Sequence, residues 1–176
     1  MKLHLGCGND YKEGYVNCDV TNKVKVDQIV DLEKPLTMFK DNSVDEIVCN
    51  HVLEHIKNFI PLIEECFRIC KNDAVLKIKV PYFAYPGAYA DPTHVRFFTL
   101  KTFDYFSSNN DLNYYSNARF EIKKKYLNPF FKRKSRLLRY ILNLFPSFYE
   151  RFFSGIFGAA EIYFELECKK IKRIGE

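Results

Sequence analysis

Five short apolar runs in the first half of the chain have the length and residue types of buried β-strands. They cover residues 2–5, 15–20, 28–31, 44–49 and 74–80. Between the last two runs, apolar residues recur at helical spacing from about Val52 to Cys70, and Pro61 predicts a break near Asn58 with a fresh helix after it. This alternation of strands and helical pattern predicts an α/β sheet.

The second half of the chain has a different pattern. An irregular stretch spans about residues 82–99, a short helix is expected near 102–107, and residues 120–126 and 162–171 alternate as strands. A basic, aromatic helical segment from about 132 to 157, interrupted at Pro146, separates these two strands. The whole pattern predicts a single three-layer α/β domain over residues 1–176. Its core is expected in about 1–127 and 160–172, with a helical insertion at about 130–158.

The composition is that of a folded domain. The chain has 176 residues, of which 47% are hydrophobic and 28% charged, enough to bury a core. Its six cysteines include no Cys-x-x-Cys pair, which predicts buried thiols in a reducing compartment. No signal peptide precedes the first run and no stretch of 18 uncharged apolar residues occurs, so we expect a cytoplasmic protein without a membrane span.

The net charge of +5 is concentrated in the second half. Residues 1–100 carry 12 basic and 14 acidic side chains, whereas residues 101–176 carry 15 and 8. Eight of these basic residues fall between Lys123 and Arg139 with no acidic residue among them. Residues 132–145 of such a segment can contact a membrane peripherally or bind a lipid-linked substrate. The favoured interpretation is a helix that caps the site with its apolar side inward and joins the last two strands.

The ends of the first four strands carry residues suited to ligand binding. Gly6-Cys7-Gly8 follows the first strand, where glycines permit a tight turn and a close approach of backbone N–H groups. Asp19 ends the second strand, Asp31-Leu32 follows the third and Asn50-His51 follows the fourth. Because the carboxyl ends of parallel strands meet at one edge of a sheet, these residues are predicted to surround one ligand.

Three longer segments contain these residues. They read Leu-His-Leu-Gly-Cys-Gly-Asn at 3–9, Gly-Tyr-Val-Asn-Cys-Asp-Val at 14–20 and Asp-Asn-Ser-Val-Asp-Glu-Ile-Val-Cys-Asn-His-Val-Leu-Glu-His at 41–55. Together they resemble the class I S-adenosylmethionine-dependent methyltransferases, in particular the small methyltransferase-11-like subset. The resemblance covers about residues 2–83 and, more loosely, the last strand. It implies a Rossmann-like, mostly parallel sheet with an antiparallel last strand, reduced to a loop after the first strand.

The resemblance also implies S-adenosylmethionine as cofactor and a role for each residue at this edge. The loop would pass beneath the methionine part, with its N–H groups on the carboxylate, and Asp19 would accept hydrogen bonds from both ribose hydroxyls. Asp31 would accept a hydrogen bond from the adenine amino group, and the Leu32 N–H would donate one to a ring nitrogen of adenine. Asn50 and His51 would line the methionine end. The residues expected to bind the cofactor are therefore Gly6, Cys7, Gly8, Asn9, Asp19, Asp31, Leu32, Asn50 and His51. Each carboxylate can alternatively be a solvated turn residue.

The chain departs from the family pattern at two positions. Family members often carry an acidic residue where this chain has His4, and usually a third glycine where it has Asp10. The missing acid removes an indirect anchor of the cofactor's ammonium group. Only ten residues separate Gly8 from Asp19, which is too few for a crossover helix and argues against a nicotinamide dinucleotide fingerprint.

The acceptor side is predicted from residues that follow the fourth and fifth strands. His55 and His94 are the candidate general bases for a hydroxyl or amine acceptor. Asp91 is expected to orient His94, and Arg96 to hold an anionic group. Tyr82 and Tyr85 are expected to wall the same pocket. The alternatives are that His94 is a capping or exposed residue and that the tyrosines serve packing.

A rival motif lies inside the third segment. His51-Val52-Leu53-Glu54-His55 matches the His-x-x-Glu-His pattern of inverted zinc metalloproteases. Its first histidine falls at a predicted strand end, away from the helix that such a site requires. The Asn-Pro-Pro-aromatic tetrad of amino-methylating DNA enzymes is absent, so no DNA partner is expected. We therefore expect methyl transfer, without a metal, to a small-molecule or glycan-type acceptor. A non-catalytic S-adenosylmethionine-binding protein and the metalloprotease are the alternatives.

Overall fold

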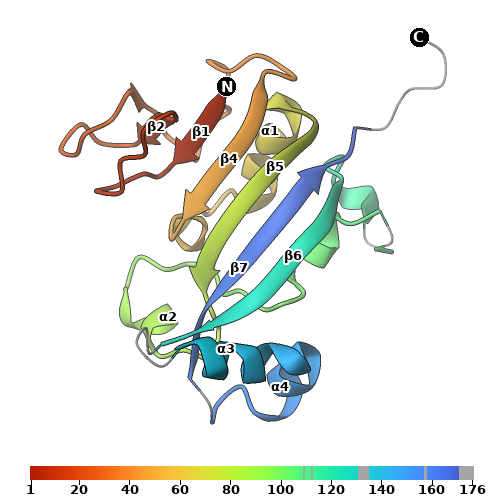
Figure 1. Cartoon of the computed structure of the whole chain (residues 1–176). Helices are drawn as coiled ribbons and strands as arrows, with labels where there is room; N and C mark the ends of the chain where they lie inside the picture. Colours follow the sequence, from red (N-terminus) through yellow and green to blue (C-terminus); the bar gives the residue numbers. More distant parts are fainter. Residues whose placement is uncertain (109, 112, 131–134, 157, 171–176) are drawn as a thin grey trace.

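Seven strands form one sheet in the order β3-β2-β1-β4-β5-β7-β6 (Figure 1). The structure is a computed structural model that describes residues 1–108, 110–111, 113–130, 135–156 and 158–170. The strands are β1 (Lys2–Leu5), β2 (Val16–Asp19), β3 (Gln28–Ile29), β4 (Val44–Asn50), β5 (Cys70–Pro81), β6 (Phe120–Pro129) and β7 (Ala159–Cys168). β7 pairs antiparallel with β5 and β6, and the other pairs are parallel. This topology confirms the predicted fold class.

One face of the sheet carries the core. Its buried strand residues are Leu3, Leu5, Ile47, Leu76, Ile78, Phe164 and Leu166. Helix α1 (Phe59–Ile69) buries its apolar side against this face, and the 3₁₀ helix η2 (Thr102–Phe106) adds Phe103, whose ring lies 4.7 Å from that of Phe164. Two shorter 3₁₀ helices are η1 (Leu53–His55) and η3 (Asn113–Tyr115). In Figure 1, α1 lies behind the sheet.

The opposite face of the sheet is polar. Lys77 Nζ lies 2.9 Å from Glu46 on β4, and Lys124 Nζ lies 2.8 Å from Glu165 on β7. These cross-strand ion pairs are suited to a face in contact with water. Over the middle of this face, which is turned toward the viewer in Figure 1, the described residues place no helix. The third layer expected from the sequence is therefore wrong for this face in the described part of the chain, and the reduction of the fold extends beyond the loop after the first strand.

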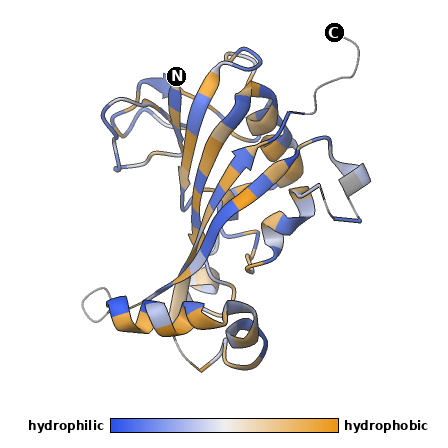
Figure 2. Cartoon of the chain, turned by 45° about the vertical axis from the view of Figure 1, so that its right-hand side comes forward, coloured by the Kyte–Doolittle hydropathy of each residue, from blue (hydrophilic) through white to orange (hydrophobic). Residues whose placement is uncertain are grey.

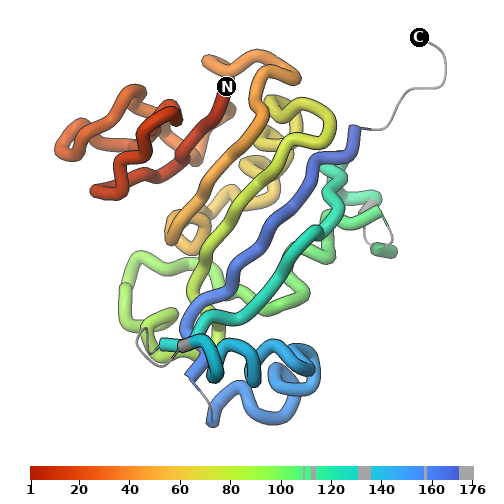
Figure 3. Tube along the Cα trace, viewed as in Figure 1, coloured from red at the N-terminus to blue at the C-terminus, as the bar shows by residue number. Residues whose placement is uncertain are grey.

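The links between β1 and β4 run as loops beside the sheet (Figure 3). This agrees with the loop expected between Gly8 and Asp19. The helix break expected near Asn58 is present, but α1 begins at Phe59, so that Pro61 lies within its first turn. The strand expected over residues 74–80 begins earlier, because β5 already starts at Cys70. The local distortion is Asp73, with φ 62°, opposite a register shift between Val44 and Glu46.

The helices α3 (Ser135–Leu144) and α4 (Pro146–Phe152) lie between β6 and β7 and project from one end of the sheet (Figures 1 and 2). The short helix α2 (Gly87–Ala90) lies near the same end. Leu142 and Tyr149 are buried, whereas most other apolar residues of α3 and α4 are exposed. The expected inward apolar side is thus wrong for most of this segment; Lys132, Arg133 and Lys134 lie outside the described residues. In the described part of the chain, every helix is too short or too polar to cross a membrane.

Candidate functional site

The loop after β1 depends on glycine for two different reasons. Gly6 has φ +61°, and a Cβ there would lie 2.3 Å from Cγ2 of Val52, which follows β4. Gly8 has φ +49°, but a Cβ there would meet no atom within 4 Å. Gly6 therefore lets β1 and the segment after β4 approach closely, while Gly8 presents open space beside its backbone.

Contacts within the protein hold this loop. Gly8 N–H donates to Asp19 Oδ2 at 2.9 Å, and Cys7 N–H donates to Cys18 O at 3.0 Å. The expectation that both N–H groups meet the cofactor's carboxylate is thus wrong, because β2 already accepts them. Asp19 Oδ1 accepts only a long bond of 3.3 Å from Thr21 N–H. Since a carboxylate has about four acceptor positions, the partly exposed Asp19 retains capacity for ribose hydroxyls.

The residues after β3 form a turn of their own. Asp31 Oδ1 accepts the Glu33 N–H at 3.0 Å, and Oδ2 lies 3.1 Å from Lys34 Nζ. The Glu33 hydrogen bond, followed by Lys34, lowers the pKa of Asp31. The Leu32 side chain is buried in the core, so only its backbone is placed for a role in adenine binding. Asp31 is thus a turn carboxylate that still has acceptor positions free.

Asp10 links β1 to β4 at this edge. Its Oδ2 accepts a hydrogen bond from Asn50 Nδ2 at 3.2 Å and from Lys12 Nζ at 2.8 Å, and it lies 4.0 Å from His4 Nε2. His4 is fully buried with no hydrogen-bond partner at either ring nitrogen, and burial lowers its pKa, so the ring is neutral. Asp10 therefore places an acid beside the position where the family often has one.

The strand order places these groups side by side. β3, β2, β1 and β4 are consecutive in the sheet and parallel, so Asp31, Asp19, the Gly6–Asp10 loop and Asn50 follow one edge. We call this edge the cofactor rim. Carboxylates that accept hydroxyl and amine donors, together with the open space at Gly8, fit the chemistry of a nucleoside attached to an amino acid.

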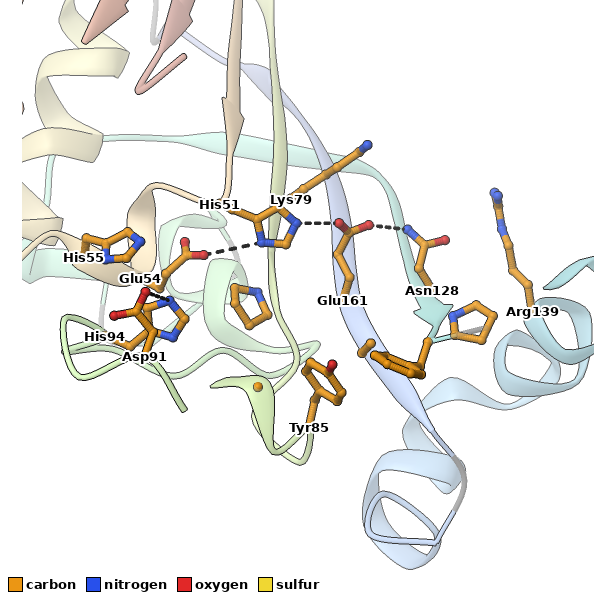
Figure 4. A pocket seen from close by; sticks show the side chains of 15 residues that line it. His51, Glu54, His55, Lys79, Tyr85, Asp91, His94, Asn128, Arg139 and Glu161 are labelled. Atoms are coloured by element: carbon orange, nitrogen blue, oxygen red, sulfur yellow. Dashed lines mark hydrogen bonds and ion pairs between the residues drawn. The ribbon is translucent and has the colours of Figure 1, made fainter. Parts of the chain in front are cut away.

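His51 lies where the cofactor rim ends. It has φ 50°, a left-handed conformation uncommon for a residue with a side chain. Its Nε2 lies 2.7 Å from Glu161 Oε2 on β7, and its Nδ1 lies 3.4 Å from Glu54 Oε1 (Figure 4). Hydrogen bonds to Glu161 and then Glu54 raise the pKa of His51 to about 9. The imidazole is therefore protonated at neutral pH.

A cavity of about 720 Å³ opens beside His51 (Figure 4). We call it the acceptor cavity. Residues from β4 to η1, from the segment after β5, and from β6, α3 and β7 line it. Its polar and aromatic lining includes His51, Glu54, His55, Lys79, Tyr85, Asp91, His94, Asn128, Phe130, Arg139 and Glu161. Both predicted histidine bases thus lie in one cavity that adjoins the cofactor rim.

His55 and His94 face each other, with ring centroids 4.7 Å apart. His94 Nδ1 lies 2.8 Å from Ala88 O, which only accepts, so this nitrogen carries the proton. His55 Nδ1 lies 2.8 Å from Thr93 Oγ1, whose own proton points to Asp91 Oδ1 at 2.6 Å, so His55 Nδ1 is also a donor. In its neutral form, each ring therefore keeps an unprotonated Nε2 that can accept a proton.

Two predicted acceptor residues lie elsewhere. Tyr82 is fully buried in the core and does not line the acceptor cavity. The guanidinium of Arg96 stacks over the Phe59 ring at 4.7 Å and donates to Lys57 O, so it is turned away from the cavity. Both expectations are corrected, because packing occupies these side chains. Tyr85 and Asp91 do line the cavity, as expected.

The rival zinc arrangement is not formed. His51 turns to Glu161 and precedes η1, whereas His55 turns to Thr93, so the two do not share a helix face. Within the described residues, a group that can hold a metal ion consists of Glu54, His55 and His94, whose ligand atoms lie within 4.8 Å of one another. The metalloprotease motif therefore lacks its geometry, although a different cation site has suitable ligands.

Sequence reasoning missed several residues of the acceptor cavity. Lys79 and Glu161 follow the strand alternation and point to the polar face, but nothing local marked them as site residues. Asn128 and Arg139 come from β6 and α3, which only the tertiary fold brings to this place. Glu54 was visible inside the His-x-x-Glu-His motif. It is 1% exposed, and its Oε1 lies 3.4 Å from His51 Nδ1.

The cysteines take no part in the site chemistry. All six are buried free thiols, as predicted. Burial raises the pKa of Cys49, at the end of β4, to about 12, and burial likewise raises the pKa of Cys7 in the rim loop. Such thiols stay protonated and are poor nucleophiles.

Comparison with known proteins gives a match over the cofactor rim. A family model described as a methyltransferase domain, of the methyltransferase-11 type, matches residues 7–78. No curated protein sequence matches the chain. The match supports the resemblance to methyltransferase-11-type domains over these residues, and S-adenosylmethionine is the cofactor that this resemblance implies. It ends before the segments that build most of the acceptor cavity.

Solved structures share the whole fold. An S-adenosylmethionine-dependent methyltransferase from Archaeoglobus fulgidus has a TM-score of 0.65 at 17% identity, over 94% of this chain and 85% of that chain. One from Mesorhizobium loti has a TM-score of 0.61 at 11% identity, over 94% and 89%. The cyclase SpnF has a TM-score of 0.60 at 14% identity, over 96% and 74%. These identities show the fold, and the cyclase illustrates that the fold alone does not determine the reaction.

Proposed function

We propose that this chain, which carries a class I methyltransferase domain of the methyltransferase-11 type, transfers a methyl group from S-adenosylmethionine to a hydroxyl of a small-molecule or glycan-type acceptor. The observation that carries the proposal is the junction at His51, where the cofactor rim meets a cavity containing two histidines with free Nε2 atoms. The volume of about 720 Å³ is typical of small-molecule sites.

The lining of the acceptor cavity supports a hydroxyl-rich acceptor. Lys79 supplies a donor for hydroxyl or anionic oxygens. Asn128 Nδ2 already donates to Glu161 Oε1 at 2.7 Å, and the Arg139 guanidinium stacks over the Tyr126 ring at 4.1 Å, so these two add polar lining and positive charge. The rings of Tyr85 and Phe130, with centroids 5.3 Å apart, supply flat apolar surface beside these polar groups. A small molecule or a glycan unit combines these two kinds of surface.

The cofactor rim and the acceptor cavity have separate roles in the proposed reaction. S-adenosylmethionine supplies a methyl group activated by a sulfonium. The acceptor oxygen forms a bond to the methyl carbon while the carbon–sulfur bond breaks and sulfur keeps the electron pair. The hydroxyl proton passes to Nε2 of His94, beside His55, and Asp91 Oδ2, 3.9 Å from that nitrogen, stabilises the imidazolium. Positioning by the cavity walls supplies much of the remaining acceleration.

The test is methyl transfer from labelled cofactor to pools of sugars, sugar conjugates and small hydroxylated molecules. We expect labelled product with the wild-type protein, and its loss in His94→Gln with cofactor binding retained. Cofactor binding without product from any pool would instead identify a non-catalytic binding protein. Absence of cofactor binding by a folded sample would contradict the proposal.

The cation-holding group supplies a second test. Glu54, His55 and His94 could bind a divalent ion in place of a proton. The proposal uses the histidines without a metal, so exhaustive dialysis against a chelator should leave methyl transfer unchanged. Activity lost on dialysis and restored by Zn²⁺ or Mn²⁺ would overturn this use of the histidines.

A further inference from the structure

Helices α3 and α4 carry a dense set of exposed apolar side chains. Leu137, Tyr140, Ile141, Leu144, Phe145, Phe148, Phe152 and Ile156 are each 46–73% exposed. In Figure 2, both helices project beyond one end of the sheet, and much of their ribbon has the colour of hydrophobic residues. Leu142 and Tyr149 already bury their side chains against the fold, so these exposed residues are not needed for packing. An apolar surface of this size marks an interaction site.

The charge of the same segment indicates the partner. Residues 130–158 contain six basic side chains, at positions 132, 133, 134, 136, 139 and 151, and one acidic side chain, Glu150, for a net charge of +5. Glu150 Oε2 accepts the Leu100 N–H at 2.9 Å, so the only acid of this segment is turned toward the fold. A second copy of the chain would bring two such basic surfaces together. The charge instead complements an anionic partner.

We propose that α3 and α4 dock onto an anionic lipid bilayer. The exposed leucine, isoleucine and phenylalanine side chains enter the boundary between headgroups and acyl chains, and Arg136 and Arg151 lie among the lipid phosphates. Tyrosine suits the same depth, because its ring is apolar and its hydroxyl is polar. Both helices are too short to span the bilayer, so they lie on it.

Membrane docking also indicates the class of methyl acceptor, an inference that rests on the proposed function. Arg139 of α3 and Phe130, at the end of β6, line the acceptor cavity. The bilayer surface and the cavity therefore share one end of the molecule. The acceptor that fits this arrangement is a hydroxyl-bearing or glycan-type group on a lipid anchor, delivered to the cavity from the membrane.

The test is co-sedimentation of the whole protein with vesicles of phosphatidylcholine alone or with phosphatidylglycerol added. We expect binding to the anionic vesicles that weakens as salt is raised. The double variant Phe145→Ser/Phe148→Ser should bind at least about tenfold more weakly, and Arg136→Gln about fivefold more weakly, as expected for one basic residue near such a surface. These side chains are exposed, so the variants should retain the wild-type unfolding temperature.

The matched control is Tyr114→Ser/Tyr115→Ser, which removes two exposed aromatic rings of η3. It should bind vesicles like the wild type. The proposal is overturned if anionic vesicles do not sediment the protein, if the phenylalanine variant binds equally well, or if sedimentation velocity shows that this surface pairs two copies instead. Calorimetry with S-adenosylmethionine, done without vesicles, tests the proposed function separately, so either result can fail alone.

Discussion

The cofactor rim and the acceptor cavity adjoin at His51 but are held in different ways. The rim depends on backbone requirements that particular residues meet, such as the left-handed φ of Gly6 and Gly8 and the Gly8 N–H on Asp19, 11 residues away. The cavity depends on contacts between distant segments, since His51 and Glu161 are 110 residues apart. Backbone requirements leave a motif in the sequence, and long-range contacts do not. The family match covers the rim and ends at residue 78, before most of the cavity residues.

The largest expected effect separates the two regions by function. His94→Gln removes the proposed base, so kcat should fall by about 10²–10⁴-fold, the usual contribution of a general base. The affinity for S-adenosylmethionine should stay unchanged, because His94 lies in the cavity and not on the rim. Steady-state kinetics and calorimetry on the same sample measure both. An unchanged kcat would remove His94 from the mechanism.

The next effect tests the backbone requirement of the rim. Gly6→Ala should lower the free energy of unfolding by about 2–5 kcal/mol, combining a steric overlap with a left-handed conformation. Gly8→Ala is the matched control: it has a similar φ but open space, and should cost about 1–2 kcal/mol. Urea unfolding compares them. Equal losses would show that the approach of Gly6 to Val52 is not a constraint.

A smaller effect tests Asp10 as a replacement for the acid missing at His4. Asp10→Asn should weaken S-adenosylmethionine binding about two- to fivefold, because the carboxylate is 57% exposed and its field is screened by water. The loss should shrink at high salt. Glu13→Gln removes an exposed charge from the same loop and should leave the affinity unchanged. Equal affinities for both variants would remove Asp10 from the cofactor site.

The smallest expected effect is on the pH dependence of stability and concerns His51, where the rim meets the cavity. The pKa of His51 is raised to about 9 in the folded protein, above its ordinary value near 6.5. The stabilisation from its carboxylate contacts is therefore complete below about pH 6.5 and is lost as pH rises through about 9. Thermal unfolding should show a decline over this window that is absent in His51→Asn, a residue that accepts the left-handed conformation. Glu161→Gln should reduce the same decline, and an unaltered decline would contradict the ion pair.

Local signals in the sequence predicted the strands and the rim. The apolar runs, Gly6-Cys7-Gly8 and Asp19 each reflect requirements of a few neighbouring residues, and the structure places them at one edge. Which hydrogen bonds the loop makes was not predictable, because Cys18 and Asp19 compete with the cofactor for its N–H groups. The start of β5 was misjudged because Lys71-Asn72-Asp73 has turn composition, and these residues lie at the register shift where Cys70 pairs with Val44 and Val75 with Glu46.

The acceptor side was predicted less well, since tertiary packing determines it. His55, His94, Asp91 and Tyr85 reach the cavity, but Tyr82 and Arg96 are taken up by the core and by the Phe59 ring. The amphipathic pattern of α3 was visible, yet the pattern cannot tell whether its apolar side faces the fold or the exterior. Contacts of α3 with β6 and α4 decide this, and they leave most of that side exposed.

The most direct measurement is calorimetric titration of the folded protein with S-adenosylmethionine and with its demethylated product, for the wild type and Asp19→Ala. The account predicts saturable binding at one site per chain in the wild type. The variant should lose about 1–3 kcal/mol of binding free energy, or about five- to 150-fold in affinity, because cofactor hydroxyls lose their acceptor. No heat with either ligand, or equal affinity in Asp19→Ala, would contradict the central claim that this edge of the sheet binds the cofactor.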